Sequence, residues 1–235
     1  TWVFYDSQTA KNWISKTNFP KVFKLRGGAG SQNVQLVKSK EKALQIVKKA
    51  YGKGFPVYDG WGSLKERYRK WSAGSDDFTQ VLKGVVRIFN PPRYSKVMGG
   101  EINYLYFQEF IENNDSDVRI IVIDGKAFGI KRMNRDNDFR ASGSGNIIYK
   151  RESIDEIFVK TAFKIHEKIE GQCVAYDFVY DQKRNPLLIE ISYGFANAAY
   201  DNCPGYWDTN LHWNEGPFNP YGWMVDLVLK QSNGE

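Results

Sequence analysis

The chain has 235 residues, with 33 Lys and Arg against 27 Asp and Glu, a formal net charge of +6 and 42% hydrophobic residues. This composition is typical of a soluble globular protein and excludes a disordered or fibrous chain. No stretch approaches the roughly 20 apolar residues of a membrane-spanning helix, so a membrane protein is excluded. The two cysteines and two histidines exclude a disulfide framework and a His-rich metal site, and they predict a reducing, cytoplasmic location.

Positive charge is concentrated near the N-terminus. Residues 11–53 contain eleven Lys and Arg residues and one acid, Glu41. Such a segment could attract nucleic acid or a small polyanion such as a nucleotide. The alternative is a solvent-exposed, lysine-rich helix face, which does not account for Lys24 and Arg26, because these two lie inside an apolar run.

The first half of the chain predicts two strands and a helix. Apolar and basic residues alternate over 20–26, the glycine-rich stretch 27–31 interrupts them, and a second strand is expected over 33–37. Ser39 is expected to cap a helix that extends to about Tyr51. Residues 52–100 predict an extra subdomain with one or two helices.

The second half predicts two hairpins and a helix. A strand is expected over 104–111, and 118–123 with 126–133 form a hairpin whose Asp124-Gly125 pair favours a two-residue turn. Ser153 and Glu156 have the spacing of a capping box, which predicts a helix from there to Gly171. A second hairpin is expected from 174–181 and 187–192.

The second hairpin carries two acids at matching positions. A turn centred between Lys183 and Arg184 would place Asp177 directly opposite Glu190, where like charges repel. Two partly buried carboxylates need a proton, a basic side chain or a divalent cation between them, and an all-oxygen site favours Mg²⁺. A slipped register, which would put one acid in water, is the alternative.

The glycine-rich loop is a candidate anion site. Its backbone N–H groups could surround a phosphate, with Lys24 and Arg26 on the preceding strand. The loop residues concerned are Gly27, Gly28, Gly30 and Ser31. No Gly-Lys-Ser/Thr follows, so this is not a Walker A sequence, and an ordinary turn is the alternative.

A third group of charges follows the first hairpin. Lys131 and Arg132 end the strand, and Arg140 follows in a polar loop. The hairpin register predicts that Asp117 faces Arg132, for which a structural salt bridge is one explanation. If the fold brings these cations together with Lys24, Arg26 and the two acids, they would form a site for a magnesium-bound triphosphate.

In this order, these motifs resemble those of the ATP-grasp superfamily, nearest to the branch of the ribosomal-protein glutamate ligases and glutathione synthetases. The resemblance covers about residues 17–195, without 52–100. It implies an α+β ATP-grasp fold in which two lobes with largely antiparallel sheets clasp a nucleotide. The small lobe would span 1–108, with the extra subdomain, and the large lobe 109–235.

The resemblance also implies roles for individual residues. Lys24, Arg26 and the glycine-rich loop would contact the phosphates, and Asp117 the ribose. The hinge that binds adenine would comprise Gln108, Glu109, Phe110 and Ile111. Lys131, Arg132 and Arg140 would be catalytic, with Lys131 on the nucleotide. Arg119, Arg132 and Arg140 would contact the substrate, and the metal would be bound by Asp177, Glu190 and Ser192.

Three departures from the family pattern are visible. Ser192 stands where the family usually has Asn, and Ser142 replaces another common Asn. The family's N-terminal domain, with an additional nucleotide-binding lysine, would precede residue 1. We therefore expect the chain to represent a ligase core.

The implied activity is an ATP- and Mg²⁺-dependent carboxylate–amine ligation through an acyl phosphate, with Mn²⁺ as an alternative metal. The partners would be a nucleotide, a carboxylate and an amine acceptor, with no membrane, no expected nucleic acid and a homodimer left open. The alternative is a catalytically incomplete ATP-binding module or a glycan-binding module. Aromatic side chains near the C-terminus could stack on sugars or simply pack on the core: Tyr200, Tyr206, Trp207, Trp213, Phe218, Tyr221 and Trp223.

Overall fold

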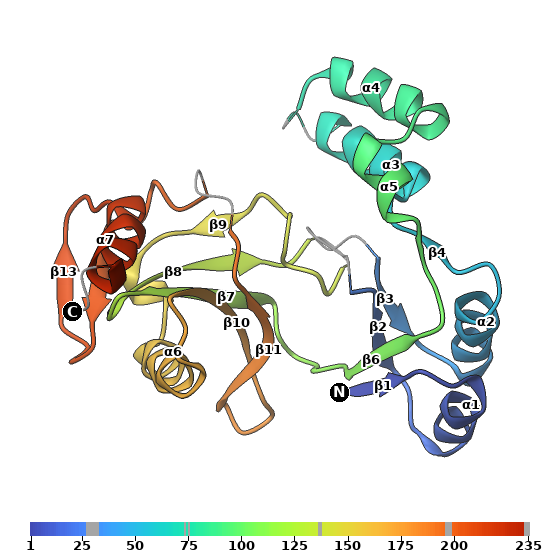
Figure 1. Cartoon of the computed structure of the whole chain (residues 1–235), viewed down its shortest axis with the longest axis horizontal. Helices are drawn as coiled ribbons and strands as arrows, with labels where there is room; N and C mark the ends of the chain where they lie inside the picture. The colour runs from blue at the N-terminus through green and yellow to red at the C-terminus, as the bar shows by residue number, and fades with distance from the viewer. Residues whose placement is uncertain (27–32, 73, 75, 136–137, 196–198, 233–235) are drawn as a thin grey trace. The chain divides into compact units, whose positions relative to one another are not determined.

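The structure, a computed structural model, describes residues 1–26, 33–72, 74, 76–135, 138–195 and 199–232 (Figure 1). They form two compact units, Thr1–Phe110 and Ile111–Glu235, each with its own sheet and core. Both units combine helices with antiparallel strands, which confirms the α+β class.

The first unit is built on a four-stranded antiparallel sheet in the order β1-β6-β2-β3. Its strands are β1 (Trp2–Phe4), β2 (Lys21–Lys24), β3 (Val34–Val37) and β6 (Leu105–Glu109). The strands predicted on either side of the glycine-rich loop are therefore confirmed as β2 and β3, which pair with each other.

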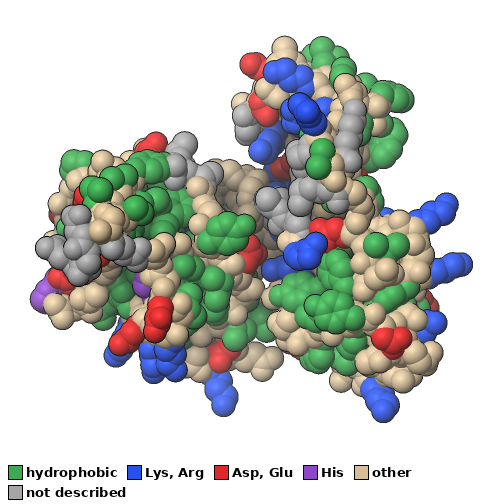
Figure 2. Space-filling view, in the orientation of Figure 1, with side chains coloured by type: hydrophobic (Ala, Val, Ile, Leu, Met, Phe, Trp, Pro, Cys, Tyr) green, Lys and Arg blue, Asp and Glu red, His purple; other side chains and the backbone are tan. Residues whose placement is uncertain are grey.

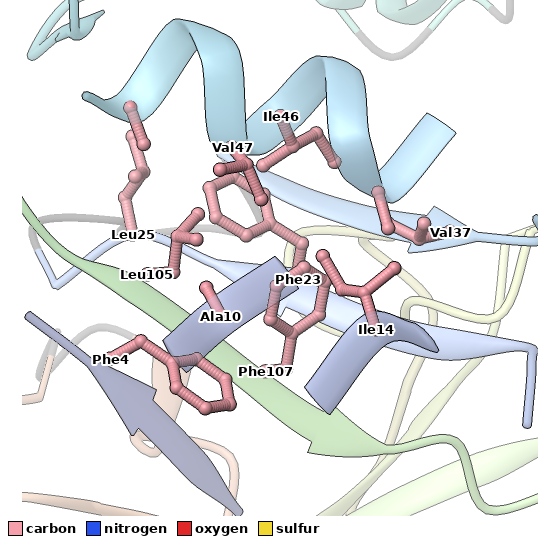
Figure 3. Close-up of a cluster of buried hydrophobic side chains, with 12 residues drawn as sticks. Phe4, Ala10, Ile14, Phe23, Leu25, Val37, Ile46, Val47, Leu105 and Phe107 are labelled. Carbon is pink, nitrogen blue, oxygen red and sulfur yellow. The ribbon is translucent and has the colours of Figure 1, made fainter. Parts of the chain in front are cut away.

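Two amphipathic helices pack on this sheet, α1 (Ser7–Lys16) and α2 (Lys40–Ala50). Ser39 caps α2 as predicted, because its side chain accepts a hydrogen bond from the Lys42 N–H. Figure 3 shows Ile46 and Val47 of α2 directed toward Phe23 and Phe107 of the sheet. The lysines of α2 lie on its opposite face and are exposed, as the helix-face interpretation predicted.

Residues 55–101 form a helical segment within the first unit. It contains α3 (Gly60–Ser72), α4 (Phe78–Phe89) and α5 (Arg93–Met98), bracketed by the short paired strands β4 (Phe55–Pro56) and β5 (Gly100–Glu101). The expectation of one or two helices was wrong. The Pro91-Pro92 pair lies in the break between α4 and α5, and Pro92 is the N-cap residue of α5.

The second unit contains a larger antiparallel sheet in the order β11-β10-β7-β8-β12-β13, with β9 also paired to β8. Both predicted hairpins are present. The first joins β7 (Ser116–Ile123) to β8 (Lys126–Met133), and the second joins β10 (Cys173–Tyr180) to β11 (Pro186–Ser192). The shorter strands are β9 (Ile147–Ile148), β12 (Gly205–Asp208) and β13 (Trp213–Glu215).

The turn of the first hairpin has the predicted conformation. Asp124 and Gly125 have φ angles of 47° and 70°, the left-handed region that a two-residue turn of this kind requires.

Helices α6 (Glu156–Ile169) and α7 (Pro220–Ser232) complete the second unit. The predicted capping box was wrong. Ser153 belongs to a short 3₁₀ turn, where its hydroxyl donates to the Lys150 carbonyl, and the Asp155 side chain caps α6 by accepting from the Ile157 N–H. Phe158 and Val159 of α6 pack on one side of the sheet with Val118 and Ile120.

The aromatic residues near the C-terminus pack largely into the cores. Phe218 and Trp223 stack with their rings 5.2 Å apart, next to the buried Phe128. Of the seven residues considered for sugar stacking, only Tyr221 is exposed, and the other six are buried or partly buried. Within the described ranges, every helix is too short or too polar to traverse a lipid bilayer.

Candidate functional site

The hairpin β10–β11 places Asp177 opposite Glu190, as the sequence predicted. The register shifts by one residue between Asp177 and Phe178, so a bulge lies directly beside the acid pair. Because opposed residues of an antiparallel pair project from the same face, both acids lie on one side of the sheet.

Asp177 is buried and bound by two arginines. Arg119 Nε and Nη2 donate to its two carboxylate oxygens at 2.5 and 2.6 Å, and Arg132 Nη2 donates to Oδ2 at 2.8 Å. Arg119 is the cross-strand neighbour of Asp177 on β7, which explains the first of these pairs.

A second buried pair continues this network. Asp117 and Arg132 face each other across β7 and β8, as predicted, and form two hydrogen bonds of 2.6 and 2.7 Å. The salt bridge considered in the sequence analysis is therefore present. The ion network, as we call Asp117, Arg119, Arg132 and Asp177, has no net charge when all four groups are ionised.

Burial and pairing act in opposite directions on the two acids. Burial raises the pKa of Asp177, but the hydrogen bonds of Arg119 and the charge of Arg132 outweigh it and hold the pKa below its usual value. For Asp117 burial dominates, and with the nearby charge of Asp177 it raises the pKa despite Arg132. Burial alone would lower the pKa values of both arginines, but the acids raise them, so both remain charged.

Ser192, the third expected metal ligand, follows Glu190 by two residues on β11. Glu190 is exposed, and the Ser192 hydroxyl donates to the Gly194 carbonyl at 2.8 Å. Nowhere among the described residues do three or more His, Cys, Asp or Glu side chains gather as they would around a metal ion. The two facing carboxylates suit a hard cation such as Mg²⁺, although both oxygens of Asp177 already accept hydrogen bonds.

Lys131 and Arg140 are two further predicted cations of the second unit. Lys131 pairs in register with Val118, whose side chain belongs to the core beneath α6, so it projects from the face opposite Arg132. Arg140 binds Asp138 at distances of 2.5 to 3.0 Å. Burial raises the pKa of Asp138, but the hydrogen bonds of Arg140 outweigh it and hold that pKa below its usual value.

The candidates of the first unit lie on β2 and β6. Lys24 ends β2, and Gln108 and Glu109 end β6 directly before Phe110 and Ile111. Gln108 donates to the Tyr106 hydroxyl at 2.8 Å. Glu109 accepts a 2.7 Å hydrogen bond from the buried Lys21, its partner in register on β2.

The glycine-rich loop lies outside the described residues, and so do the predicted phosphate contacts Gly27, Gly28, Gly30 and Ser31. Its two borders are described. Leu25 N–H donates to the Asn33 carbonyl at 3.2 Å, and Arg26 N–H donates to the Tyr104 hydroxyl at 2.7 Å. Tyr104 in turn donates to Glu101, and burial raises its pKa to about 12.

Sequence reasoning missed several residues around the candidate site. Lys21, Tyr104 and Tyr200 contact predicted site residues, and Tyr200 is buried beside Arg119. The contact of Lys21 with Glu109 depends on the pairing of β2 with β6, and no local pattern indicates it because the two residues are 88 positions apart in the sequence. The contact of Asp138 with Arg140 could have been predicted from the sequence, because an acid two residues before an arginine is an obvious local partner.

With this geometry established, comparison with known proteins defines the class. A family described as the RimK-like ATP-grasp domain matches residues 80–201, from α4 to the segment after β11. The chain belongs to this family of ATP-grasp proteins. The match begins within the helical segment that the resemblance had left out. No curated protein matches the chain.

Two solved structures share the fold. One is the biotin carboxylase domain of a 2-oxoglutarate carboxylase from Hydrogenobacter thermophilus, with a TM-score of 0.51 and 13% identity over 97% of this chain and 40% of that one. The other is the ATP-grasp ligase PsnB complexed with a minimal precursor, with a TM-score of 0.50 and 10% identity over 97% of this chain and 54% of that one. The chain thus spans about half or less of these relatives.

Proposed function

We propose that the chain acts as an ATP- and Mg²⁺-dependent ligase that joins a carboxylate to an amine. The observation that carries this proposal is the facing pair Asp177 and Glu190, which lies inside the part of the chain that matches the ATP-grasp family. The two fold relatives support a nucleotide substrate, since one is bound to MgADP and the other is an ATP-grasp ligase.

In the proposed reaction, an oxygen of the substrate carboxylate bonds to the γ-phosphorus while the bond to the ADP oxygen breaks. The amine nitrogen then bonds to the acyl carbon, phosphate leaves with the C–O electron pair, and the nitrogen releases a proton to solvent. Such a reaction needs positioning and charge neutralisation rather than a protein nucleophile. Burial raises the thiol pKa values to about 11 for Cys173 and about 12 for Cys203, which fits this requirement.

We assign the phosphates to Lys24, Arg26 and the glycine-rich loop in the first unit, and to Lys131 and Arg140 in the second. Adenine is assigned to residues 108–111 and the ribose to Asp117. Arg119 and Arg132 are assigned to the anionic substrate, because their guanidinium groups keep their charge despite burial.

Mg²⁺ is assigned to Asp177 and Glu190, with Ser192 nearby on β11, and when bound it would neutralise phosphate charge. Asp177 Oδ2 accepts two guanidinium hydrogen bonds, whereas Oδ1 accepts one and keeps a second lone pair, so Oδ1 is the oxygen assigned to the metal. The hydrogen bonds that Asp177 already accepts from Arg119 and Arg132 also favour a second candidate function, an ATP-binding module without turnover.

The first test is thermal unfolding with the non-hydrolysable analogue AMPPNP, with and without Mg²⁺. A ligand at 100 times its Kd adds about 2.7 kcal/mol, which raises Tm by roughly 5–10 °C for a chain of this size. The shift should require Mg²⁺ and decrease in Lys24→Met and Glu190→Gln. Matched controls are Lys38→Met and Glu167→Gln, both at exposed positions. An equal shift in all variants would contradict the site.

The second test distinguishes a ligase from a binding module. Hydroxylamine replaces the amine and traps an acyl phosphate as a hydroxamate, which is assayed across a panel of carboxylates with ATP and Mg²⁺. Hydroxamate and ADP formed in equal amounts, and lost in Glu190→Gln, would support the ligase. A Mg²⁺-dependent melting shift without hydroxamate from any carboxylate would favour the binding module.

A further inference from the structure

The polar loop between β8 and β9 carries Arg140, one of the cations assigned to the phosphates. Its described residues, 134, 135 and 138–146, are called the Arg140 loop below. Figure 2 shows Lys and Arg side chains scattered over both units among acidic and hydrophobic ones, so positive charge by itself does not mark a phosphate site. A cation binds a phosphate more tightly when it is held in place beforehand, because less conformational freedom is then lost on binding. The contacts that hold this loop therefore bear on the proposed nucleotide site.

Hydrogen bonds close the Arg140 loop on itself directly after its first residue. Arg135 N–H donates to the Arg140 carbonyl at 3.3 Å, and Asp138 N–H donates to the Arg135 carbonyl at 3.0 Å. Arg135 Nη2 also donates to the Ser142 carbonyl at 3.0 Å. The place of Arg140 thus depends on Arg135, and through the chain on Asn134, the residue before it.

Asn134 fastens the start of the loop to the segment that precedes β7. Its backbone N–H donates to the Asp115 carbonyl at 2.8 Å, which continues the pairing of β7 with β8 beyond Ser116 and Met133. Its side-chain Nδ2 donates to the Asn114 carbonyl, also at 2.8 Å. The side chain therefore adds a second attachment to the one that the backbone provides.

The side chain of Asn114 holds that segment in turn. Its Oδ1 accepts from the Tyr180 N–H at 2.9 Å, and its Nδ2 donates to the Tyr180 carbonyl at 3.0 Å and to the Glu112 carbonyl at 3.2 Å. Tyr180 ends β10, and the pairing of β10 with β7 ends two residues earlier at Phe178. One amide group thus takes the place of a strand partner at Tyr180, and the two asparagines connect β10 to the Arg140 loop.

The proposed reaction indicates which phosphate the loop would meet. The substrate carboxylate is assigned to Arg119 and Arg132 of the second unit, and it attacks the γ-phosphorus. The γ-phosphate then has to lie next to the second unit, so Arg140 is a cation that would contact it.

We propose that Asn114 and Asn134 are positioning residues that hold Arg140 for the γ-phosphate, so that the site distinguishes a nucleoside triphosphate from a diphosphate. The inference rests on the proposed function. In this role neither asparagine touches the nucleotide, and each acts through the backbone of the loop. Losing either side chain lowers the fraction of molecules with Arg140 in place, and the apparent affinity for the triphosphate falls by the same factor.

The first test compares AMPPNP with ADP, each with Mg²⁺, by isothermal titration of the full chain. Asn134→Ala removes one side-chain hydrogen bond and should weaken AMPPNP binding about 5-fold, while ADP binding changes by less than about 2-fold. Asn114→Ala should have the same selective effect. The control Asn210→Ala, at an exposed position, should change neither affinity.

The comparison of two nucleotides separates this inference from the proposed function. Equal losses for AMPPNP and ADP would overturn the inference and leave the proposed function standing, because general damage to the fold does not depend on the γ-phosphate. A wild-type chain that binds neither nucleotide would overturn both.

A double variant tests whether Asn134 acts through Arg140. Arg140→Gln should weaken AMPPNP binding selectively, and adding Asn134→Ala to it should cause no further loss, because the two changes affect one interaction. Additive losses would overturn the inference.

Hydrogen exchange tests the asparagine contacts without any nucleotide. In the ligand-free chain, the amides of Arg135 and Asp138 should exchange about 5-fold faster in Asn134→Ala than in the wild type, whereas the amide of Ile121 in β7 should not change. Unchanged exchange in the loop would overturn the inference. Because Asn134→Ala keeps the contacts of Asn114 with Tyr180, this test remains decisive if Asn114→Ala fails to fold.

Discussion

Asp177 and Arg119 are neighbours in register on β10 and β7, and two hydrogen bonds of 2.5 and 2.6 Å join them in a buried environment. The register explains the contact, because opposed side chains of antiparallel strands lie about 5 Å apart. The second partner, Arg132, reaches Asp177 from β8, so one carboxylate connects three strands of the sheet.

Asp177→Asn is therefore expected to lower the free energy of unfolding by about 3–5 kcal/mol, because the buried Arg119 would lose its anionic partner and the buried Arg132 would lose one of its two. Urea unfolding monitored by circular dichroism measures this loss. Glu190→Gln, on the opposite strand but exposed, is the control and should change stability by less than about 0.5 kcal/mol. Losses of similar size in both variants would contradict a structural role for the ion network.

A pH dependence is expected from His166. This half-buried ring lies 2.8 Å from the Tyr176 hydroxyl, and burial lowers its pKa. The folded state then binds fewer protons than the unfolded state below about pH 6.5, so stability should fall as the pH decreases through that value.

His166→Gln should flatten this dependence between pH 7.5 and 5. Because the ring is only half-buried, the effect is expected to stay below about 1 kcal/mol. Urea unfolding at several pH values provides the measurement. The control is His212→Gln at an exposed position, which should retain the wild-type slope. An unchanged slope in His166→Gln would refute this assignment.

Gly129 on β8 is expected to tolerate no side chain. A Cβ there would meet Ile120 Cδ1 at 2.6 Å and the Arg119 carbonyl oxygen at 2.8 Å. Gly129→Ala should therefore cost about 1–3 kcal/mol through overpacking. For comparison, a Cβ on Gly194 would meet nothing within 4 Å, and Gly194→Ala should leave the unfolding midpoint almost unchanged.

Tyr104 is expected to act as a positioning residue for the glycine-rich loop, which rests on the proposed function. Its hydroxyl accepts from the Arg26 N–H at the loop border. Losing a hydrogen bond worth about 1 kcal/mol should weaken AMPPNP binding roughly 5-fold in Tyr104→Phe. Isothermal titration with Mg²⁺ measures this affinity, and Tyr5→Phe, at an exposed position, is the control. A wild-type affinity in Tyr104→Phe would contradict the role.

Local patterns in the sequence predicted both hairpins, and the register of the first, correctly. The Asp124-Gly125 turn and the opposed pair Asp117–Arg132 follow from strand periodicity and turn length alone. Asp177 faces Glu190 as predicted, but the pairing nearer the turn is shifted by one residue, and it is the bulge beside Asp177 that brings the two acids opposite each other. Contacts between non-consecutive strands were not predictable in this way. Arg119 meets Asp177 only because β7 pairs with β10, and Lys21 meets Glu109 only because β2 pairs with β6.

The capping prediction failed for a local reason. Ser153 and Glu156 have the spacing of a capping box, but Asp155 lies nearer the helix and its carboxylate accepts the N–H of Ile157. The helical segment was underestimated because two glycines at the start of α3 and one inside α4 weaken the helical pattern. Glycine is required at position 84 because α3 and α4 approach closely, and helix propensities do not take such a tertiary contact into account.

In the strand order of the second unit, β11 comes first and has β10 as its one neighbour, so among the described residues it is an edge strand. Edge strands invite pairing with other chains, and charged side chains and prolines discourage it. Glu190, between Ile189 and Ile191, and Pro186 at the start of the strand are such residues. Replacing Glu190 with valine would therefore create an uninterrupted aliphatic edge, prone to intermolecular β-sheet aggregation, irrespective of any part the carboxylate takes in chemistry.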